Sequence, residues 1–119
     1  MEKNTTYNDL FPLQKALHRL CDSGVRFGFA DAVRLSMVMN EVDSQIDLVL
    51  GQLVEAVPGL KDVGYVMTDD EKEVYTAILS TRTAVDDMGI RIGSLQASVS
   101  DAAAVDMWTV NTLLSFFAL

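Results

Sequence analysis

The pattern that decides the fold lies in residues 31–57, which read DAVRLSMVMNEVDSQIDLVLGQLVEAV. Apolar side chains recur there in alternating steps of three and four residues, the spacing of a heptad seam along one face of an α-helix. The seam positions are Ala32, Leu35, Met39, Val42, Ile46, Val49, Leu53 and Ala56. We therefore expect one long helix that begins at an Asp31 N-cap and ends before Pro58-Gly59.

Additional apolar residues widen the stripe on this helix beyond the seam that a two-stranded coiled coil needs. They are Val38, Leu48, Leu50, Val54 and Val57. The polar side of the same segment is acidic, because no basic residue occurs between Leu35 and Leu60. The helix is thus expected to make contacts on more than one side.

A second heptad pattern begins at residues 68–71, Thr-Asp-Asp-Glu, which have the sequence of a capping box. Apolar residues then continue the alternation as far as Val99, with Thr81 at the one polar position. They are Val74, Ile78, Val85, Met88, Ile92, Leu95 and Val99. Two seams of similar length, joined by residues 58–67, predict an antiparallel helical hairpin.

Two shorter helices are expected to flank this hairpin. Residues 9–23 place Leu10, Leu13, Leu17, Leu20 and Cys21 on one helical face, and Gly24 then supplies a stop. Phe27 and Phe29, in the connection that follows, are expected to close one end of the core. After Val99 the heptad loses phase, which is compatible with a separate helix capped by Ser100-Asp101 or with one continuous helix that changes its winding.

The sequence therefore predicts an all-α fold: a long antiparallel helical hairpin with two shorter flanking helices, similar to a four-helix bundle. Residues 1–8 are polar and are expected to form a flexible N-terminal arm, whereas residues 9–119 are expected to form a single domain. The last segment, residues 105–119, is the most apolar part of the chain. It is shorter than the ~20 apolar residues of a membrane span and contains Asp106 and Asn111.

The charge of the chain disfavours nucleic acid as a partner, since 9 basic and 17 acidic residues give a net charge of -8. The single cysteine, Cys21, can form no internal disulfide, and no signal pattern occurs at the N-terminus. A reducing intracellular compartment, the cytoplasm, is therefore expected. Cys21 itself is expected to be a small buried hydrophobe.

No motif in the sequence points to an enzyme. The chain has one histidine, His18, which excludes the paired Glu-x-x-His motifs of a di-iron bundle and is expected to lie at the surface. Phosphate-binding, nucleophile-elbow and Cys-x-x-Cys motifs do not occur. We therefore expect no catalytic residue, no metal ligand and no cofactor.

The candidate functional residues are instead helix contacts or an oligomer interface. Gly89, Gly93 and Ala97 would put small residues four apart on one face of the second long helix, where another helix of the same chain or of another subunit could approach closely. Large apolar candidates lie further along, at Trp108, Leu113, Phe116 and Phe117, and these fit a protein interface or the core equally well. The methionines, including Met37, are expected to fill the core.

These expectations favour a non-enzymatic structural or assembly protein that self-associates, as a homodimer or higher homo-oligomer, through helical packing. The alternative is a small acidic adaptor, regulator or chaperone that binds another protein through its apolar C-terminal helix. Neither requires a membrane span.

Overall fold

Four α-helices make up the fold in the computed structural model, which describes residues 5–83, 85, 87–91, 97–99 and 105–117. They are α1 (Tyr7–Asp22), α2 (Phe29–Ala56), α3 (Asp69–Leu79) and α4 (Met107–Phe116). A 3₁₀ turn, η1 (Pro58–Lys61), follows α2, and the strands β1 (Val25–Phe27) and β2 (Ala97–Val99) pair with each other. The predicted all-α class is confirmed.

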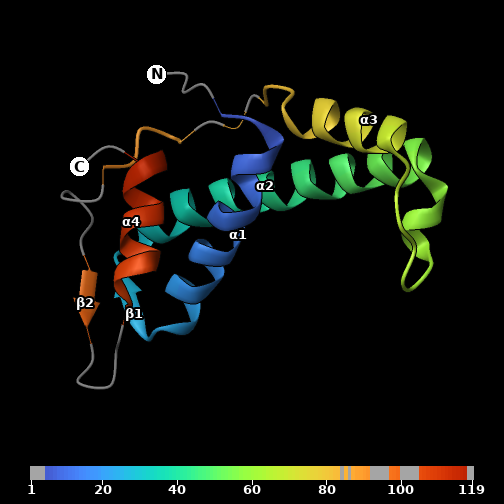
Figure 1. The fold of residues 1–119 in the computed structure, drawn as a ribbon. Helices are drawn as coiled ribbons and strands as arrows, with labels where there is room; N and C mark the ends of the chain where they lie inside the picture. Colours follow the sequence, from blue (N-terminus) through green and yellow to red (C-terminus); the bar gives the residue numbers. More distant parts are fainter. Residues whose placement is uncertain (1–4, 84, 86, 92–96, 100–104, 118–119) are drawn as a thin grey trace.

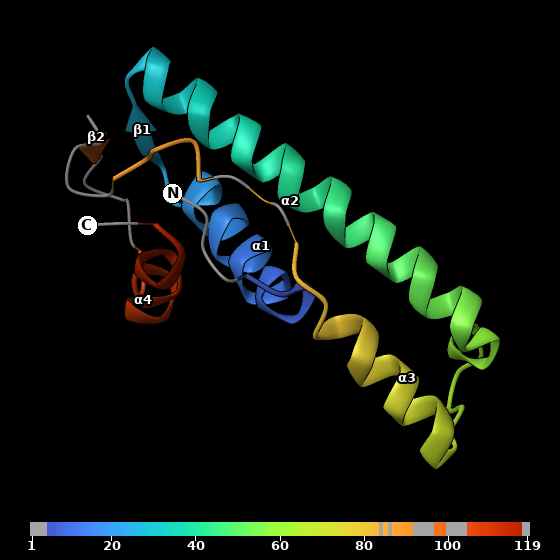
Figure 2. The same ribbon diagram turned by 90° about the horizontal axis from the view of Figure 1, so that it is seen from above.

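The long helix α2 runs through the whole molecule (Figure 1). In Figure 2, α1 and α3 follow one another along α2, and α4 packs against α1 on the side away from α2. The molecule is consequently elongated and measures 49 × 32 × 21 Å. The half of α2 near β1 has two helices stacked beside it, whereas the half near η1 has α3 alone.

The predicted seam of α2 is the side that packs against the other helices. Its residues Leu35, Val42, Ile46, Val49 and Leu53 are buried, Met39 is half-buried, and the predicted end positions Ala32 and Ala56 are exposed. Val38, one of the additional apolar residues, is buried as well. Helix α1 contributes Leu10, Leu13, Leu17 and Leu20 to the same core, as predicted. Each such side chain stabilises the fold by about 1.5–3 kcal/mol when it is fully buried.

The ends of α2 differ slightly from the prediction. The helix begins at Phe29 with Gly28 as its N-cap, so Asp31 lies in the first turn. There its carboxylate suits the positive end of the helix dipole. The helix ends at Ala56, because Pro58 carries no backbone N–H and its ring disfavours helical geometry at Val57 (φ −131°, ψ 79°).

The second arm of the hairpin is shorter than predicted. Helix α3 begins at the predicted capping box but ends at Leu79, so the helix expected to reach Val99 is wrong beyond that residue. Of the predicted seam positions, Val85 is nevertheless buried and Met88 half-buried, both from non-helical backbone, whereas Val74 is exposed. Ile90, which the pattern did not include, is buried as well.

Local hydrogen bonds explain where α3 ends. Thr81 donates its hydroxyl to the carbonyl of Ala77 at 3.1 Å, a bond by which Ser and Thr compete with the helix ladder. Further along, the Gly89 N–H donates to Asp87 Oδ1 at 2.9 Å. Met88 and Gly89 both have positive φ, 56° and 69°, which is turn geometry that interrupts a helix.

The chain after α3 pairs with the beginning of α1. The N–H of Thr83 donates to the carbonyl of Thr5 at 2.9 Å, and the N–H of Tyr7 donates to the carbonyl of Thr81 at 3.1 Å. Helix α1 thus begins two residues earlier than predicted. Residues 1–4 lie outside the described residues, and the division into an arm and a single domain stays a prediction.

The C-terminal helix is separate from α3, which answers the alternative left open by the sequence. Its N-cap is Asp106, and the predicted cap at Ser100-Asp101 lies outside the described residues. The pairing of β1, which lies between α1 and α2, with β2, which lies between α3 and α4, was not predicted. It is antiparallel, with Val25 opposite Val99 and Phe27 opposite Ala97.

Candidate functional site

Three of the C-terminal candidates lie in the core. Leu113, Phe116 and Phe117 are all buried, and the two phenylalanine rings meet edge to face with their centroids 4.9 Å apart. Helix α4, which carries Leu113 and Phe116, packs against α1. The sequence allowed these residues to lie either in a protein interface or in the core. In the structure they form a helix contact within the chain.

Trp108 lies at the surface of the contact between α1 and α4. Its ring centroid is 4.9 Å from the guanidinium carbon of Arg19 and 5.7 Å from Lys15 Nζ, distances typical of cation–π contacts. Arg19 also donates to Asp106 Oδ2 at 3.2 Å, while the Thr109 N–H donates to Asp106 Oδ1 at 2.7 Å. The hydrogen bonds from Thr109, assisted by the two cations, lower the pKa of Asp106.

Two of the three small residues predicted to share a helix face, Gly89 and Ala97, do not do so. Gly89 lies in a turn and Ala97 lies in β2, while Gly93 is outside the described residues. A glycine in the left-handed region is explained by the turn itself. The predicted close helix–helix approach at Gly89 and Ala97 is therefore wrong, because the helix that would have carried it ends at Leu79.

Cys21 is exposed, contrary to the prediction that it is buried. It lies at the edge of the apolar face of α1, where its Sγ is 3.8 Å from Met39 Sδ. The pKa of the Cys21 thiol is raised mainly by partial burial and, to a lesser extent, by the negative charge of Asp22. The thiol therefore stays protonated at neutral pH, which makes it a weak nucleophile.

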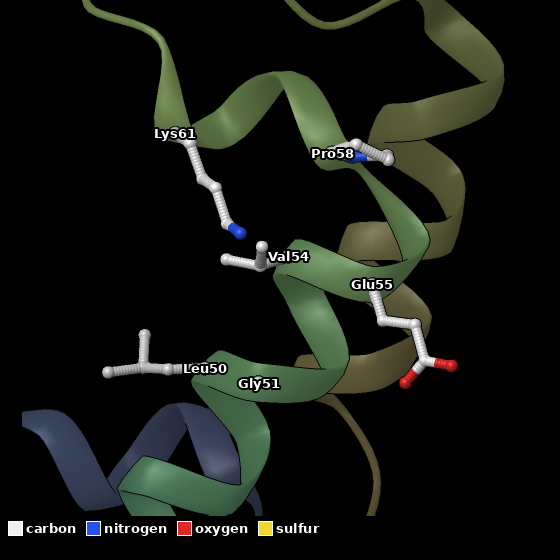
Figure 3. Close-up of a pocket in the computed structure, with 6 residues that line it drawn as sticks. All are labelled: Leu50, Gly51, Val54, Glu55, Pro58 and Lys61. Carbon is white, nitrogen blue, oxygen red and sulfur yellow. The ribbon is translucent and has the colours of Figure 1, made fainter.

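The open half of the molecule is the hairpin formed by α2 and α3. Helix α3 packs on α2 without completely burying any of its own side chains. A shallow groove, which we call the hairpin groove, runs over the end of α2. It is lined by Leu50, Gly51, Val54, Glu55, Pro58 and Lys61 (Figure 3).

The walls of the hairpin groove are mainly apolar. In Figure 3 the side chains of Leu50 and Val54 project to the same side of α2, and Lys61 extends toward Val54. Glu55 points away from them. A surface of this kind can pack against an apolar helix, and it offers few polar groups with which to orient a small polar substrate.

The connection between η1 and α3 is held by Tyr65. Its hydroxyl donates to Glu71 Oε1 at 2.6 Å, and the N–H of Thr68 donates to the same oxygen at 2.9 Å. The hydrogen bond from Thr68 and, to a lesser extent, the one from Tyr65 lower the pKa of Glu71. The hydrogen bond to Glu71 raises the pKa of Tyr65. Val63 and Val66, in the same connection, are exposed.

The outer face of α2 carries apolar residues that the sequence analysis did not single out as a surface. Phe29 and Met37 were expected in the core, yet Phe29 is 86% exposed and Met37 is 49% exposed. Val33, which lies between them, is exposed as well. The sequence signal for this surface was the four-residue spacing of Phe29, Val33 and Met37, which places them on a different face of the helix from the buried seam.

The acidic side chains of α2 are divided between its two sides. Asp43 faces α1, where it accepts from Gln14 Nε2 at 2.7 Å and lies 3.4 Å from His18 Nε2. His18 is exposed, as predicted. Asp47 and Glu55 are exposed on α2. The outer face is therefore negatively charged toward its C-terminal end.

Among the described residues, no cluster of three or more histidine, cysteine or carboxylate side chains is arranged to hold a metal ion. Within the same part of the chain, no helix has both the length and the apolarity required to cross a membrane. The chain matches no protein-family model, no curated protein and no solved structure. Functional inference therefore depends on the surfaces described above.

Proposed function

We propose that this chain is a non-enzymatic structural or assembly protein that self-associates through helical packing. The observation that carries the proposal is the exposure of large apolar side chains over the half of the molecule built from α2 and α3. These are Leu48, Leu50, Val63, Val66 and Val74. A second copy of the chain would remove such side chains from water.

The mass of the protein in solution tests this proposal. Size-exclusion chromatography coupled to light scattering, at micromolar protein concentration, should give twice the 13.1 kDa mass of the chain or a higher multiple. The apparent mass should fall on dilution according to mass action. A constant 13.1 kDa species from nanomolar to high micromolar concentration would contradict the proposal.

A second candidate function is supported by the outer face of α4. Met107, Val110 and Leu114 are exposed there with a spacing of three and four residues, the pattern with which a helix lies against another amphipathic helix. With a net charge of -8, the chain would favour a basic partner helix. In this case the protein is an acidic adaptor, regulator or chaperone.

The two functions differ in what a basic amphipathic peptide does to the protein. An adaptor should bind such a peptide with a change in the fluorescence of Trp108, the only tryptophan. The double substitution Val110→Asp and Leu114→Asp should abolish that change. A self-associating protein should keep its oligomeric mass in the same double variant and show no saturable response to the peptide.

The exposed, unpaired thiol of Cys21 supports a reducing environment. We accordingly assign the protein to the cytoplasm. The acidic charge supports a protein partner in preference to nucleic acid.

A further inference from the structure

Helix α2 carries a second heptad pattern on the face turned away from the core. Its positions alternate in steps of three and four without interruption, and we call them the outer seam. They are Ala30, Val33, Met37, Asn40, Ser44, Asp47, Gly51 and Val54. The outer seam is displaced by two residues from the buried seam, which places it about 200° around the helix, on the opposite face.

The outer seam is open along its length. All of its residues are exposed except Val54, which is half-buried. Large apolar residues also lie beside the seam at both ends: Phe29 near its start, and Leu48 and Leu50, which are 51% and 44% exposed, near its end. The outer seam is therefore apolar toward its two ends and polar at Asn40, Ser44 and Asp47 in between.

The residues of the outer seam pair with one another when two copies of α2 run antiparallel about residue 42. Val33 then lies opposite Gly51 of the second copy, and Ala30 lies opposite Val54. Met37 lies opposite Asp47, and the small polar residues Asn40 and Ser44 face each other at the centre. A polar layer among apolar ones is a feature that fixes the register of paired helices.

Gly51 fits the same arrangement. A glycine inside a helix costs about 1 kcal/mol relative to alanine, and no described atom lies within 4 Å of the position that a Cβ on Gly51 would occupy. Packing within the described residues therefore does not explain the missing side chain. In the antiparallel pair, the space beside Gly51 admits Val33 of the second copy.

Charge selects the direction of pairing. Arg34 lies beside the N-terminal half of the outer seam, whereas Asp47 and Glu55 lie in or beside its C-terminal half, and all three are exposed. Antiparallel pairing places Arg34 opposite residue 50 of the second copy, about 5 Å along the axis from Asp47 and about 8 Å from Glu55. Parallel pairing would instead place Asp47 beside its own equivalent, which is repulsive, and would separate Arg34 from both carboxylates by about 20 Å or more along the axis.

From this spacing and charge pattern we propose that the protein forms a two-fold symmetric dimer in which the outer seams of two α2 helices pack antiparallel about residue 42. The proposal rests on the proposed function of self-association and specifies one contact surface, which adjoins Leu48 and Leu50 of the exposed apolar residues, together with the direction of pairing. The partner is a second copy of this chain.

Thiol cross-linking tests the direction of pairing. In a Cys21→Ser background, one protein carries Ala30→Cys and another, with a tag of different mass, carries Val54→Cys. In the antiparallel dimer equivalent positions are 24 residues apart, about 36 Å along the helix, while positions 30 and 54 of the two copies are adjacent. A short bis-maleimide spans the ~8–10 Å between the axes of packed helices.

Mixing the two proteins should give the mixed cross-linked dimer as the main product, while each protein alone should give little. In the dimer the two thiols are held at an effective concentration of ~1 mM. The mixed product should therefore form on the order of a hundredfold faster than in a control whose thiols meet only at the bulk protein concentration of ~10 μM. That control mixes the Ala30→Cys protein with one carrying Val110→Cys on the outer face of α4.

Two results would overturn the inference. Rapid cross-linking of each protein with itself would show parallel pairing, and cross-linking no faster than in the Val110→Cys control would show that the outer seams do not pair. If light scattering nevertheless finds a dimer, self-association stands and only this surface is wrong. If the protein is a monomer at every concentration, both proposals fail.

Discussion

The aromatic ring of Tyr65 lies directly against Gly59: a Cβ added to Gly59 would be 2.5 Å from Cζ of that ring. The hydroxyl of the same ring reaches Glu71 in the first turn of α3. Tyr65 therefore connects η1 to α3 by packing at one end and hydrogen bonding at the other. Because α3 buries none of its side chains completely, such polar and terminal contacts have a large share in holding it.

Gly59→Ala should consequently destabilise α3. The added methyl group displaces the Tyr65 ring and separates its hydroxyl from Glu71, at a cost of about 1 kcal/mol, in the lower range for overpacking. Hydrogen exchange should show faster exchange of the α3 amides. Gly51→Ala, measured at a protein concentration at which the chain is monomeric, is the matched control: no described atom obstructs the new methyl group, so α2 should gain about 1 kcal/mol. Equal effects of the two substitutions would contradict this account.

The N-terminus of α3 should depend on pH. Glu71 accepts from Thr68 and Tyr65, and its pKa is lowered in the folded chain. A lowered folded-state pKa gives stability that is present above the ordinary pKa of a glutamate and is lost as pH falls through the lowered value. Exchange of the α3 amides, corrected for intrinsic rates, should therefore increase below about pH 4. In Glu71→Gln this increase should be smaller.

The Thr68 hydroxyl makes a separate contribution to the same cap. It accepts from the Glu71 N–H at 3.2 Å, and Thr68→Ala should destabilise α3 by about 1 kcal/mol, as is typical for the loss of an N-cap. The loss should persist at neutral pH, where Glu71 is ionised. Thr68→Ser, which keeps the hydroxyl, should retain most of the protection in hydrogen exchange. Equal protection in Ala and Ser variants would exclude the hydroxyl as the cause.

Sequence periodicity predicted where the core residues are better than it predicted their local structure. The seam of α2 and the capping box at Thr68 were correct, because each is encoded by neighbouring residues. The end of α3 was missed because Val85 and Met88 kept the heptad spacing beyond Leu79. Hydroxyl competition at Thr81 and the turn at Gly89 outweigh that spacing.

The candidate surfaces were only partly predictable for a related reason. Leu113 and Phe116 were recognised as large apolar residues, but their burial depends on the packing of α4 against α1, a contact between distant parts of the sequence. Val33 and Met37 were not recognised as a surface, because the buried seam already accounted for α2 as a packed helix. Exposure on a particular face becomes visible only once the other helices are placed.

Charge reversal should test the ionic contacts of the proposed dimer. Arg34→Glu or Glu55→Arg alone replaces an attraction by a repulsion twice per symmetric dimer, so each should weaken association by about 1 kcal/mol, roughly fivefold in Kd. The double variant Arg34→Glu/Glu55→Arg should recover most of the loss. Sedimentation or light scattering over a dilution series measures each Kd.

Lys72→Glu provides the control for net charge, since Lys72 is exposed on α3, a different helix from the one that carries the outer seam. It should change Kd much less than Arg34→Glu does. The difference between these variants should shrink in high salt, because exposed ion pairs are screened. If the double variant loses as much association free energy as the two single variants together, the contact between Arg34 and Glu55 is contradicted.

Removal of residues 105–119 should unfold the whole protein. The deletion takes away three large, buried apolar side chains, Leu113, Phe116 and Phe117. The loss of a large core side chain typically costs 2–5 kcal/mol, and three together approach or exceed the roughly 5–15 kcal/mol stability of a small domain. Circular dichroism should show loss of cooperative thermal unfolding. A truncated chain that still unfolds cooperatively would show that α1, α2 and α3 suffice for the core.

The contact between α1 and α4 should respond to acid through Asp106. Its pKa is lowered, first by the hydrogen bonds from Thr109 and then by the charges of Arg19 and Lys15. The cap and the bond to Arg19 are thus intact above the ordinary pKa of an aspartate and weaken as pH falls through the lowered value. Arg19 also lies over Trp108, so the fluorescence of that residue should change in the same acidic range.

Two substitutions separate the capping role of Asp106 from its ionic role. Asp106→Asn keeps an oxygen that can accept from Thr109 but removes the charge, so the acid transition of Trp108 fluorescence should disappear while α4 stays folded. Arg19→Gln removes the cation from the Trp108 ring and should shift the emission already at neutral pH, with the transition retained because Thr109 still lowers the pKa of Asp106. An unchanged acid transition in Asp106→Asn would assign it to a group other than Asp106.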